Sequence, residues 1–338
     1  MTLIGRVAAP LLALVLVGGA AACDAAPVAS SNRGPAATGA VGSDAPAPGL
    51  TVTSRPSGGC TAPDLELAAV VDHPDGIEYV ESAFLLHVPT GRSGEPLPLV
   101  VDMHGATGSR STQESASGFG ALGMREGFIT ITPQALLESR VWRLHPDGPD
   151  VANVRALLSI ATERLCVDLA RVYATGFSMG GMMAIALACD DPVRFAAIAP
   201  VAGTVEVEPC ERAVPVPFLA VHGTADDRVG YDGRMAENVG VLIGSPAGDP
   251  VPKVVGVWGA GNGCSTEPPV ADLPVSEVTG DVGRVALSCP PIGETELFVV
   301  EDGGHNQPGA PNGDPDRPGA GFDATATIWS FFARHARG

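Results

Sequence analysis

The pentapeptide Gly176-Phe177-Ser178-Met179-Gly180 constrains the fold of this chain more than any other segment. The apolar run Val172 to Thr175 precedes it, and the helix-forming run Met182 to Ala188 follows. A strand that turns directly into a helix strains the residue at the turn, and flanking glycines leave room for the neighbouring backbone. The pattern predicts a Ser178 hydroxyl exposed at a strand end, although such a string can also be a helix-capping turn in a Gly-rich chain.

Two later strand ends carry residues that a reactive serine needs. The segment His222-Gly223-Thr224-Ala225-Asp226 follows the apolar run Val216 to Val221, and Gly303-Gly304-His305 follows Leu297 to Val300. The carboxyl ends of parallel strands gather at one edge of a sheet, where such sites form. The chain order Ser, Asp, His therefore predicts a triad of Ser178, Asp226 and His305, with Asp227 as the alternative acid.

The three residue types fit nucleophilic catalysis. A serine hydroxyl is a weak nucleophile and must lose its proton as it attacks an acyl carbon. The His305 imidazole would accept that proton and later deliver it to the leaving alcohol, while Asp226 would fix the imidazole tautomer.

The run Leu97 to Met103 ends in the glycine-containing segment His104-Gly105-Ala106-Thr107-Gly108-Ser109. Such a loop can supply a backbone N–H to a developing oxyanion, and Ala106 is the expected donor. The second expected donor is the backbone N–H of Met179. The alternative is an ordinary loop between a strand and a helix.

The remaining histidines predict no metal centre and no cofactor site. His104 and His222 both precede a glycine at a strand end, where a ring usually packs and hydrogen-bonds the turn, and we interpret both as structural. His104 is in addition a candidate for the wall of a substrate pocket. The others lack the spacing of metal ligands, namely His73, His87, His145 and His335.

The hydrophobic pattern predicts alternating strands and helices. An early hairpin is expected from Ile77 to Val88, and further strands near 97–103, 128–132, 171–176, 196–201, 216–221 and 297–300. Helical spacing marks Asp150 to Leu165, and Asp323 is expected to cap a last helix. Alternation of this kind predicts an α/β fold with a mostly parallel central sheet, helices on both faces and no separate lid domain.

A wider set of motifs resembles one known family. The set comprises His104-Gly105, Cys166-Val167-Asp168, Arg171 to Met183, Ala197 to Gly203, His222 to Asp226, Asn262-Gly263-Cys264, Gly303-Gly304-His305 and Ile328 to His335. It is similar to the α/β-hydrolase esterases related to polyhydroxybutyrate depolymerases, feruloyl and acetylxylan esterases and LpqC-like lipoproteins. The resemblance implies the α/β-hydrolase fold and a serine carboxylic ester hydrolase, and it says little about the substrate.

Departures from the family concern the substrate pocket. Relatives often have Thr-Trp-Pro-Gly after the catalytic histidine, where this chain has Asn306-Gln307-Pro308-Gly309, so Gln307 should make the pocket more polar. Met179, the residue after the expected nucleophile, is similar to the residue that feruloyl-esterase members of the family have at this position. Trp142 is expected either to line the pocket or to anchor a lid, and the loops 136–148 and 266–281 are expected to shape specificity.

The N-terminal segment has the features of an export signal. Arg6 precedes the apolar run Val7 to Val17, and small residues lead to Cys23, as in a lipoprotein signal peptide covering residues 1–22. Cys23 would then be lipidated; simple secretion and a retained anchor are the alternatives. Residues 23–59 are rich in Ala, Pro, Ser and Gly and predict a disordered linker, followed by a catalytic domain over 60–338.

Charge and cysteines restrict the partners and the compartment. The formal charge of -18 and a single lysine, Lys253, exclude nucleic acid as an expected partner. Membrane contact is expected through the lipid anchor, and no protein partner is predicted. An extracytoplasmic location fits the six remaining cysteines, with Cys264 and Cys289 expected to pair and the pairing of Cys60, Cys166, Cys189 and Cys210 left open.

The sequence therefore predicts a secreted or lipid-anchored serine esterase that forms an acyl-enzyme. The expected substrates are short-chain acyl esters, hydroxyalkanoate oligomers, or feruloyl and acetyl esters. Two alternatives stay open: a serine peptidase, because the same triad cleaves amides, and a non-catalytic surface lipoprotein on a hydrolase scaffold.

Overall fold

The computed structural model describes residues 53–61, 70–71, 84–89, 94–243 and 247–338. The chain divides into two units, residues 1–45 and 46–338, and every described residue belongs to the second. The expected signal peptide, Cys23 and most of the expected linker lie outside the described residues. The end of that linker does not: Arg55 N–H donates to Asp168 Oδ1 (2.8 Å) and Ser57 Oγ donates to Leu165 O (2.7 Å). The ordered domain thus begins before the predicted boundary at Cys60.

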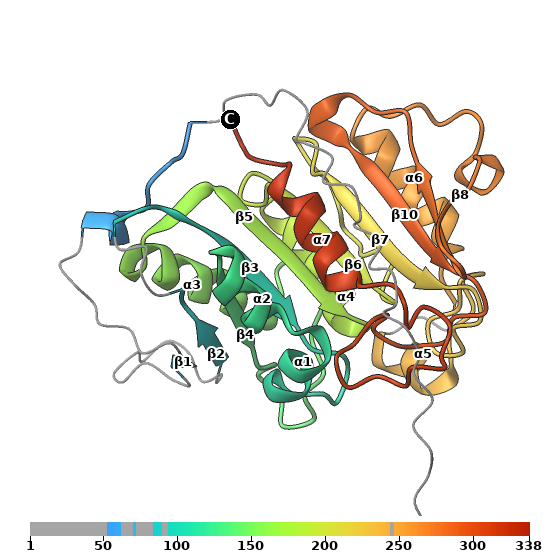
Figure 1. The fold of residues 1–338 in the computed structure, drawn as a ribbon, viewed down its shortest axis with the longest axis horizontal. Helices are drawn as coiled ribbons and strands as arrows, with labels where there is room; N and C mark the ends of the chain where they lie inside the picture. The colour runs from blue at the N-terminus through green and yellow to red at the C-terminus, as the bar shows by residue number, and fades with distance from the viewer. Residues whose placement is uncertain (1–52, 62–69, 72–83, 90–93, 244–246) are drawn as a thin grey trace, which may run out of the picture. The chain divides into compact units, whose positions relative to one another are not determined.

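A single 10-stranded sheet forms the centre of this unit, in the order β1-β2-β4-β3-β5-β6-β7-β10-β9-β8 (Figure 1). The strands are β1 Val70–Val71, β2 Phe84–His87, β3 Leu97–Met103, β4 Ile129–Pro133, β5 Val167–Phe177, β6 Ala197–Val201, β7 Phe218–Gly223, β8 Ser276–Thr279, β9 Val282–Ala286 and β10 Thr295–Val300. Strands β4, β3, β5, β6, β7 and β10 run parallel, and the strands at both edges pair antiparallel. The sheet is therefore mixed, with a parallel centre.

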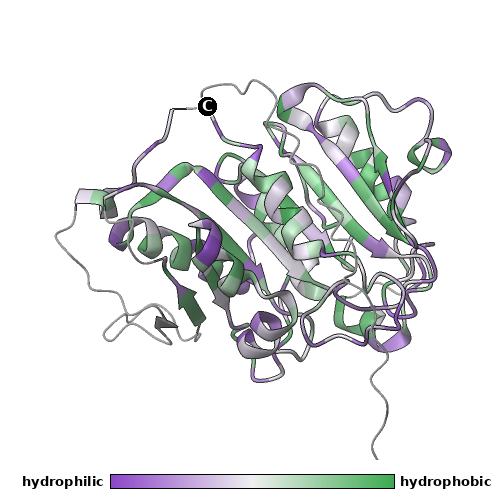
Figure 2. Cartoon of the chain, viewed as in Figure 1, coloured by the Kyte–Doolittle hydropathy of each residue, from purple (hydrophilic) through white to green (hydrophobic). Residues whose placement is uncertain are grey.

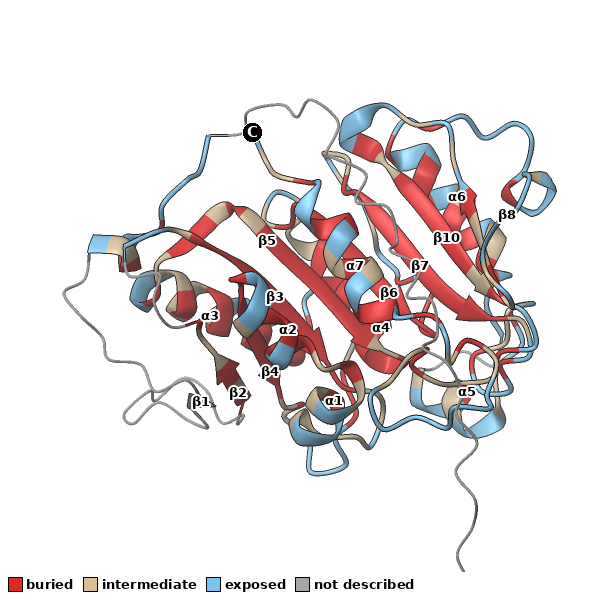
Figure 3. Cartoon of the chain, in the orientation of Figure 1, coloured by how far each residue is buried: buried red, intermediate tan, exposed pale blue. Residues whose placement is uncertain are grey.

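Burial explains which strands are central. Every residue of β3, β4, β6 and β7 is buried, as expected for parallel strands covered on both faces (Figure 3). Figure 2 shows apolar residues running along β3 and β7. The edge strand β2 alternates between buried and half-buried residues, and β8 is largely exposed.

Helices cover both faces of the sheet. They are α1 Arg110–Ser117, α2 Phe119–Glu126, α3 Pro149–Arg164, α4 Met179–Asp190, α5 Glu237–Ile243, α6 Val251–Gly261 and α7 Ala324–Ala333. Leu99 and Val101 of β3 pack into one apolar cluster with α3, α4 and α6, whereas Val100 packs into the other with α2 and α7. This alternation follows from the two-residue period of a strand and confirms the predicted layers.

The predicted strands 97–103, 128–132, 171–176, 196–201, 216–221 and 297–300 match β3, β4, β5, β6, β7 and β10 within a few residues. The expected hairpin from Ile77 to Val88 lies mostly outside the described residues, and its second strand, β2, pairs antiparallel with β1 and β4. The expectation that 266–281 is a specificity loop is wrong in part. This segment contains β8, which pairs with β9 at the outer edge of the sheet. The sequence did not mark β8 as a strand because its residues are largely exposed.

Three disulfides join Cys60 to Cys166, Cys189 to Cys210 and Cys264 to Cys289. The predicted Cys264–Cys289 bond is thus present, and the structure supplies the two pairings that the sequence left open. None of the described helices combines the length and hydrophobicity that a membrane crossing requires.

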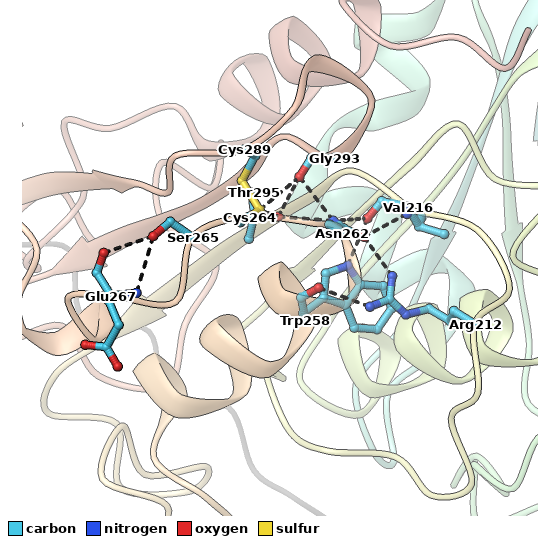
Figure 4. Close-up of a disulfide and its surroundings, with 10 residues drawn as sticks. All are labelled: Arg212, Val216, Trp258, Asn262, Cys264, Ser265, Glu267, Cys289, Gly293 and Thr295. Atoms are coloured by element: carbon cyan, nitrogen blue, oxygen red, sulfur yellow. Dashed lines mark hydrogen bonds between the residues drawn. A yellow bond between two sulfur atoms is a disulfide. The ribbon is translucent and has the colours of Figure 1, made fainter.

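A buried amide stabilises the region around the Cys264–Cys289 disulfide (Figure 4). Asn262 Oδ1 accepts from Arg212 Nη1 (2.8 Å) and Val216 N–H (2.9 Å), and Asn262 Nδ2 donates to Val216 O (2.8 Å). The Trp258 indole N–H also donates to Val216 O (2.9 Å). These bonds tie α6 to the amino end of β7, far from the strand ends that carry the predicted triad.

Candidate active site

Ser178 occupies the turn between β5 and α4. Its φ of 54° lies in the left-handed region, which is unusual for a residue other than glycine. A Cβ on Gly180 would overlap Met103 O, and one on Gly203 would overlap Ser178 O. Glycine is therefore required at both positions, and the pentapeptide predicts the first of them, Gly180.

The structure brings together the three residues of the predicted triad from three strand ends. His305 Nε2 lies 2.9 Å from Ser178 Oγ, and His305 Nδ1 lies 2.8 Å from Asp226 Oδ2. Ser178 follows β5, Asp226 follows β7 and His305 follows β10, so the parallel order of the sheet creates the cluster. A carboxylate can only accept a hydrogen bond, so His305 carries its proton on Nδ1, and Nε2 is free to accept the serine proton.

The Asp226 carboxylate accepts three hydrogen bonds and lies beside a second imidazole. Its Oδ1 accepts the backbone N–H groups of Arg228 (2.8 Å) and Val229 (2.9 Å), and its Oδ2 faces both His305 and His222. Burial alone would raise the pKa of Asp226, but the hydrogen bonds from His222 and His305 outweigh it and hold that pKa well below its usual range. Asp226 is thus the anionic partner.

Sequence reasoning did not assign His222 a part in the site. Its ring is fully buried, its Nε2–H donates to Val229 O (2.7 Å), and Nε2 lies 3.4 Å from Asp226 Oδ2. The ring therefore braces the turn that carries the acid. The spacing of His222 and Asp226, four residues apart around a strand end, is the signal that could have shown this.

The rival acid points elsewhere. The Asp227 side chain is 83% exposed and pairs with Arg228 at 3.9 Å. Within the described part of the chain, the carboxylate that contacts His305 is that of Asp226, so the two neighbouring carboxylates have different environments.

The loop after β3 contains the first expected oxyanion donor, the Ala106 N–H. Thr107 N–H donates to Arg140 O (2.9 Å) and Gly108 N–H donates to Gly105 O (3.0 Å), whereas no acceptor for Ala106 N–H occurs in the described part of the chain. Met179 is the first residue of α4, where N–H groups have no partner within the helix. Both N–H groups are therefore available, and the helix dipole favours negative charge at Met179.

The other expected pocket residues are largely buried. His104 and Trp142 are each 1% exposed, and the Trp142 indole N–H donates to His104 O (2.7 Å). Trp142 thus lies behind the loop of Ala106 rather than forming an open pocket wall. Gln307 is also buried and follows His305 in the loop that leads to α7.

No group of three or more potential metal ligands occurs within the described ranges. The site offers a nucleophile in contact with a base, a base in contact with a carboxylate, and two free N–H groups nearby. This set of groups can perform acyl transfer by covalent catalysis.

Comparison with known proteins finds similarity to esterases. Residues 82–232 match the family model described as esterase PHB depolymerase. The chain is 29% identical over 238 residues to feruloyl esterase B of Piromyces equi, covering 65% of this chain and 42% of that protein. It is 29% identical over 269 residues to feruloyl esterase C of Emericella nidulans, covering 78% of this chain and 86% of that protein.

A solved structure agrees at the level of the fold. The acetyl xylan esterase from Aspergillus awamori has a TM-score of 0.56 and 15% identity, covering 79% of this chain and all of that one. Feruloyl esterase B extends well beyond the match, since the chain spans less than half of its length. The chain is thus similar to esterases of the polyhydroxybutyrate depolymerase and feruloyl esterase type, and it has the α/β-hydrolase fold.

Proposed function

We propose that this protein is a serine carboxylic ester hydrolase that acts through an acyl-enzyme. The observation that carries the proposal is the continuous relay from Ser178 Oγ to His305 (2.9 Å) and from His305 to Asp226 (2.8 Å). Ser178 Oγ attacks the ester carbonyl while its proton passes to His305 Nε2. The oxyanion that forms accepts the N–H groups of Ala106 and Met179.

Collapse of the tetrahedral intermediate completes the first half of the reaction. The bond from the carbonyl carbon to the alcohol oxygen breaks, and His305 donates its proton to that oxygen. Water then attacks the acyl-enzyme, with His305 as base, and the carboxylic acid leaves as Ser178 regains its proton. Asp226 stays anionic and stabilises the imidazolium in both halves.

The proposed substrate class is supported by the relatives and by one residue of this chain. The relatives are feruloyl esterases, and the matching family model is that of polyhydroxybutyrate depolymerases. We infer that the substrates are short acyl esters, hydroxyalkanoate oligomers, or feruloyl and acetyl esters. Gln307, where relatives often carry tryptophan, favours the smaller and more polar of these acyl groups.

The compartment is proposed on two grounds. Three disulfides favour an oxidising, extracytoplasmic environment. The residues before Cys23 have the pattern of a lipoprotein signal, so we propose that lipidation of Cys23 anchors the catalytic domain through a linker.

A panel of p-nitrophenyl esters and peptide p-nitroanilides tests the activity. We expect hydrolysis of acetyl and butyryl esters, no cleavage of the anilides, and loss of ester hydrolysis by about 10⁴-fold or more in Ser178→Ala. Cleavage of anilides with the esters left intact would assign the triad to a peptidase. A second panel of hydroxybutyrate oligomers, feruloylated sugars and acetylated xylan would rank the natural esters.

A further inference from the structure

The loop between β3 and α1 cannot by itself fix the direction of the Ala106 N–H. It spans residues 104–109, and its internal backbone hydrogen bond is the turn from Gly108 N–H to Gly105 O (3.0 Å). A peptide plane held by one turn can rotate about its flanking bonds. An oxyanion donor has to be aimed before the reaction, because its value comes from preorganisation.

The side chain of His104 holds that peptide plane. His104 Nδ1 lies 2.7 Å from Gly105 O, and the carbonyl of Gly105 belongs to the same peptide unit as the Ala106 N–H. The C=O and N–H of a planar trans peptide point in opposite directions. An imidazole that holds the Gly105 carbonyl therefore directs the Ala106 N–H away from itself.

The bonds of His104 determine which of its ring nitrogens carries the proton. Nε2 lies 3.2 Å from the Ala135 N–H, which must donate, and 2.8 Å from Gln134 Nε2. Since Nε2 accepts, the proton is on Nδ1, where it donates to Gly105 O. Burial lowers the pKa of His104 below its ordinary value, which keeps this neutral form.

His104 is in turn fixed by the segment after β4. The Trp142 indole N–H donates to His104 O (2.7 Å), and the two rings lie 4.7 Å apart. Gln134 Oε1 accepts Arg110 N–H (3.1 Å) at the start of α1, so one side chain bridges His104 and the far end of the loop. Contacts from one neighbouring segment therefore hold the loop on both sides of Ala106.

We propose that His104 is a positioning residue that aims the Ala106 N–H at the oxyanion, and that Trp142 fixes His104 for this task. The proposal rests on the function proposed above. It assigns to a buried imidazole and a buried indole an effect on the rate of the chemical step, without contact to the substrate.

The chain offers a matched pair of tryptophans for the test. Trp142 and Trp258 are both buried, and each donates its indole N–H to a backbone carbonyl, at 2.7 Å and 2.9 Å. Trp258 is in α6 and bonds to Val216 at the amino end of β7, away from the site. Phenylalanine at either position keeps a ring and removes the donor, so both variants should lose stability, and the thermal midpoint of each is measured alongside the kinetics.

We expect Trp142→Phe to lower kcat for p-nitrophenyl acetate about tenfold or more and to leave KM within about twofold. The reason is that the Ala106 N–H, which Trp142 helps to position, stabilises the transition state. Its Ki for phenylboronic acid, which forms a tetrahedral adduct with serine, should rise by a similar factor. Trp258→Phe should leave both within about twofold. Equal kinetics in the two variants would overturn the proposal about His104 and Trp142. The proposed esterase function would still stand in that case, provided that the wild-type protein hydrolyses esters through Ser178.

A second pair decides the matter if Trp142→Phe does not fold. His104→Leu removes the donor to Gly105 O and should lower kcat on the order of a hundredfold, the usual loss for one oxyanion donor. His104→Asn retains an N–H near the Nδ1 position and should recover part of that loss. Wild-type kcat in His104→Leu, or no difference between the two variants, would overturn the proposal. Failure of wild-type protein to hydrolyse any ester would instead refute the proposed function, and this inference with it.

Discussion

At the scale of single residues, environment separates two adjacent carboxylates into different roles. Asp226 is buried, accepts three hydrogen bonds and lies 3.4 Å from His222 Nε2, whereas Asp227 projects into solvent beside Arg228. The buried anion can stabilise an imidazolium because the Asp226 carboxylate is already desolvated before His305 becomes charged. An exposed carboxylate is screened by water and contributes little.

This contrast gives the first prediction. Asp226→Asn should lower kcat about a thousandfold or more, since an amide favours the wrong tautomer of His305 and cannot balance the charge of the His305 imidazolium. Asp227→Asn, the matched control one residue along, should leave kcat and KM within about twofold. Steady-state kinetics on p-nitrophenyl butyrate measures both, and a large loss in Asp227→Asn would move the acid to that position.

The sequence allowed the placement of Ser178, Asp226 and His305 because each stands directly after an apolar strand, and parallel strands bring such positions together. It did not reveal that His222 contacts Asp226 or that Gln134 bridges His104 and Arg110. These contacts depend on how neighbouring loops turn, which no periodic pattern encodes. Trp142 shows the same limit, since its role depends on the direction of one indole N–H.

At the scale of elements, backbone strain gathers at the carboxyl ends of the parallel strands. Non-glycine residues with a left-handed φ follow five different strands, β3, β4, β5, β6 and β10: Thr107, Arg140, Ser178, Ala202 and Asp302. Each such conformation costs on the order of 1–3 kcal/mol and persists only where the surroundings enforce it. The strands and helices thus hold a strained rim around the site.

The elbow between β5 and α4 gives the second prediction. A methyl group on Gly180 would overlap the backbone of Met103, so Gly180→Ala should displace Ser178 and lower kcat at least a hundredfold. Gly304→Ala is the control, because no atom lies within 4 Å of its Cβ position although it adjoins His305. Similar activities for the two variants would show that the elbow tolerates displacement.

Helix α1 is tied to β3 by a buried carboxyl group. Asp102 Oδ1 accepts from Gln113 Nε2 (2.7 Å) and Asp102 Oδ2 accepts from Ser117 Oγ (2.6 Å). Burial, only partly opposed by these bonds, raises the pKa of Asp102 to about 7. The unfolded chain loses this proton near its ordinary pKa of about 3.9, so the folded state alone holds the proton between these values. Stability contributed by this proton therefore falls as pH rises across that window.

The third prediction follows from that sign. Asp102→Asn cannot ionise, so relative to wild type it should gain stability between pH 5 and pH 8, by on the order of a few kcal/mol. Calorimetric melting at both pH values measures the change in the difference between the two proteins. Asp314→Asn, in an exposed loop, serves as the control. A difference between Asp102→Asn and wild type that is independent of pH would contradict the account.

At the scale of the whole molecule, one parallel core carries the site and disulfides fasten the periphery. The Cys60–Cys166 bond closes a sequence separation of 106, against 21 for Cys189–Cys210 and 25 for Cys264–Cys289. The core strands were predictable because most of their residues are apolar. The edge strand β8 was not, since its exposure removes the pattern, and β9 buries only Val282 and Val285. The pairing of four cysteines required the fold.

The separations give the fourth prediction. In the loop-entropy model the Cys60–Cys166 bond contributes about 4–5 kcal/mol and each shorter bond about 3 kcal/mol. Replacing both cysteines of the long bond by serine should therefore lower the free energy of unfolding more than the same change at Cys189 and Cys210. Urea titration of the two double variants compares them, and the reverse order would show that native contacts outweigh loop closure.

Labelling with a fluorophosphonate probe tests the central assignment most directly, with residual ester turnover measured at each extent of labelling and the adduct located by peptide mass spectrometry. The account predicts one adduct on Ser178, turnover that falls in proportion to it, no adduct in Ser178→Ala and a strongly reduced rate in His305→Ala. Full turnover in protein labelled completely at Ser178, or an adduct at another residue in well-folded protein, would contradict it.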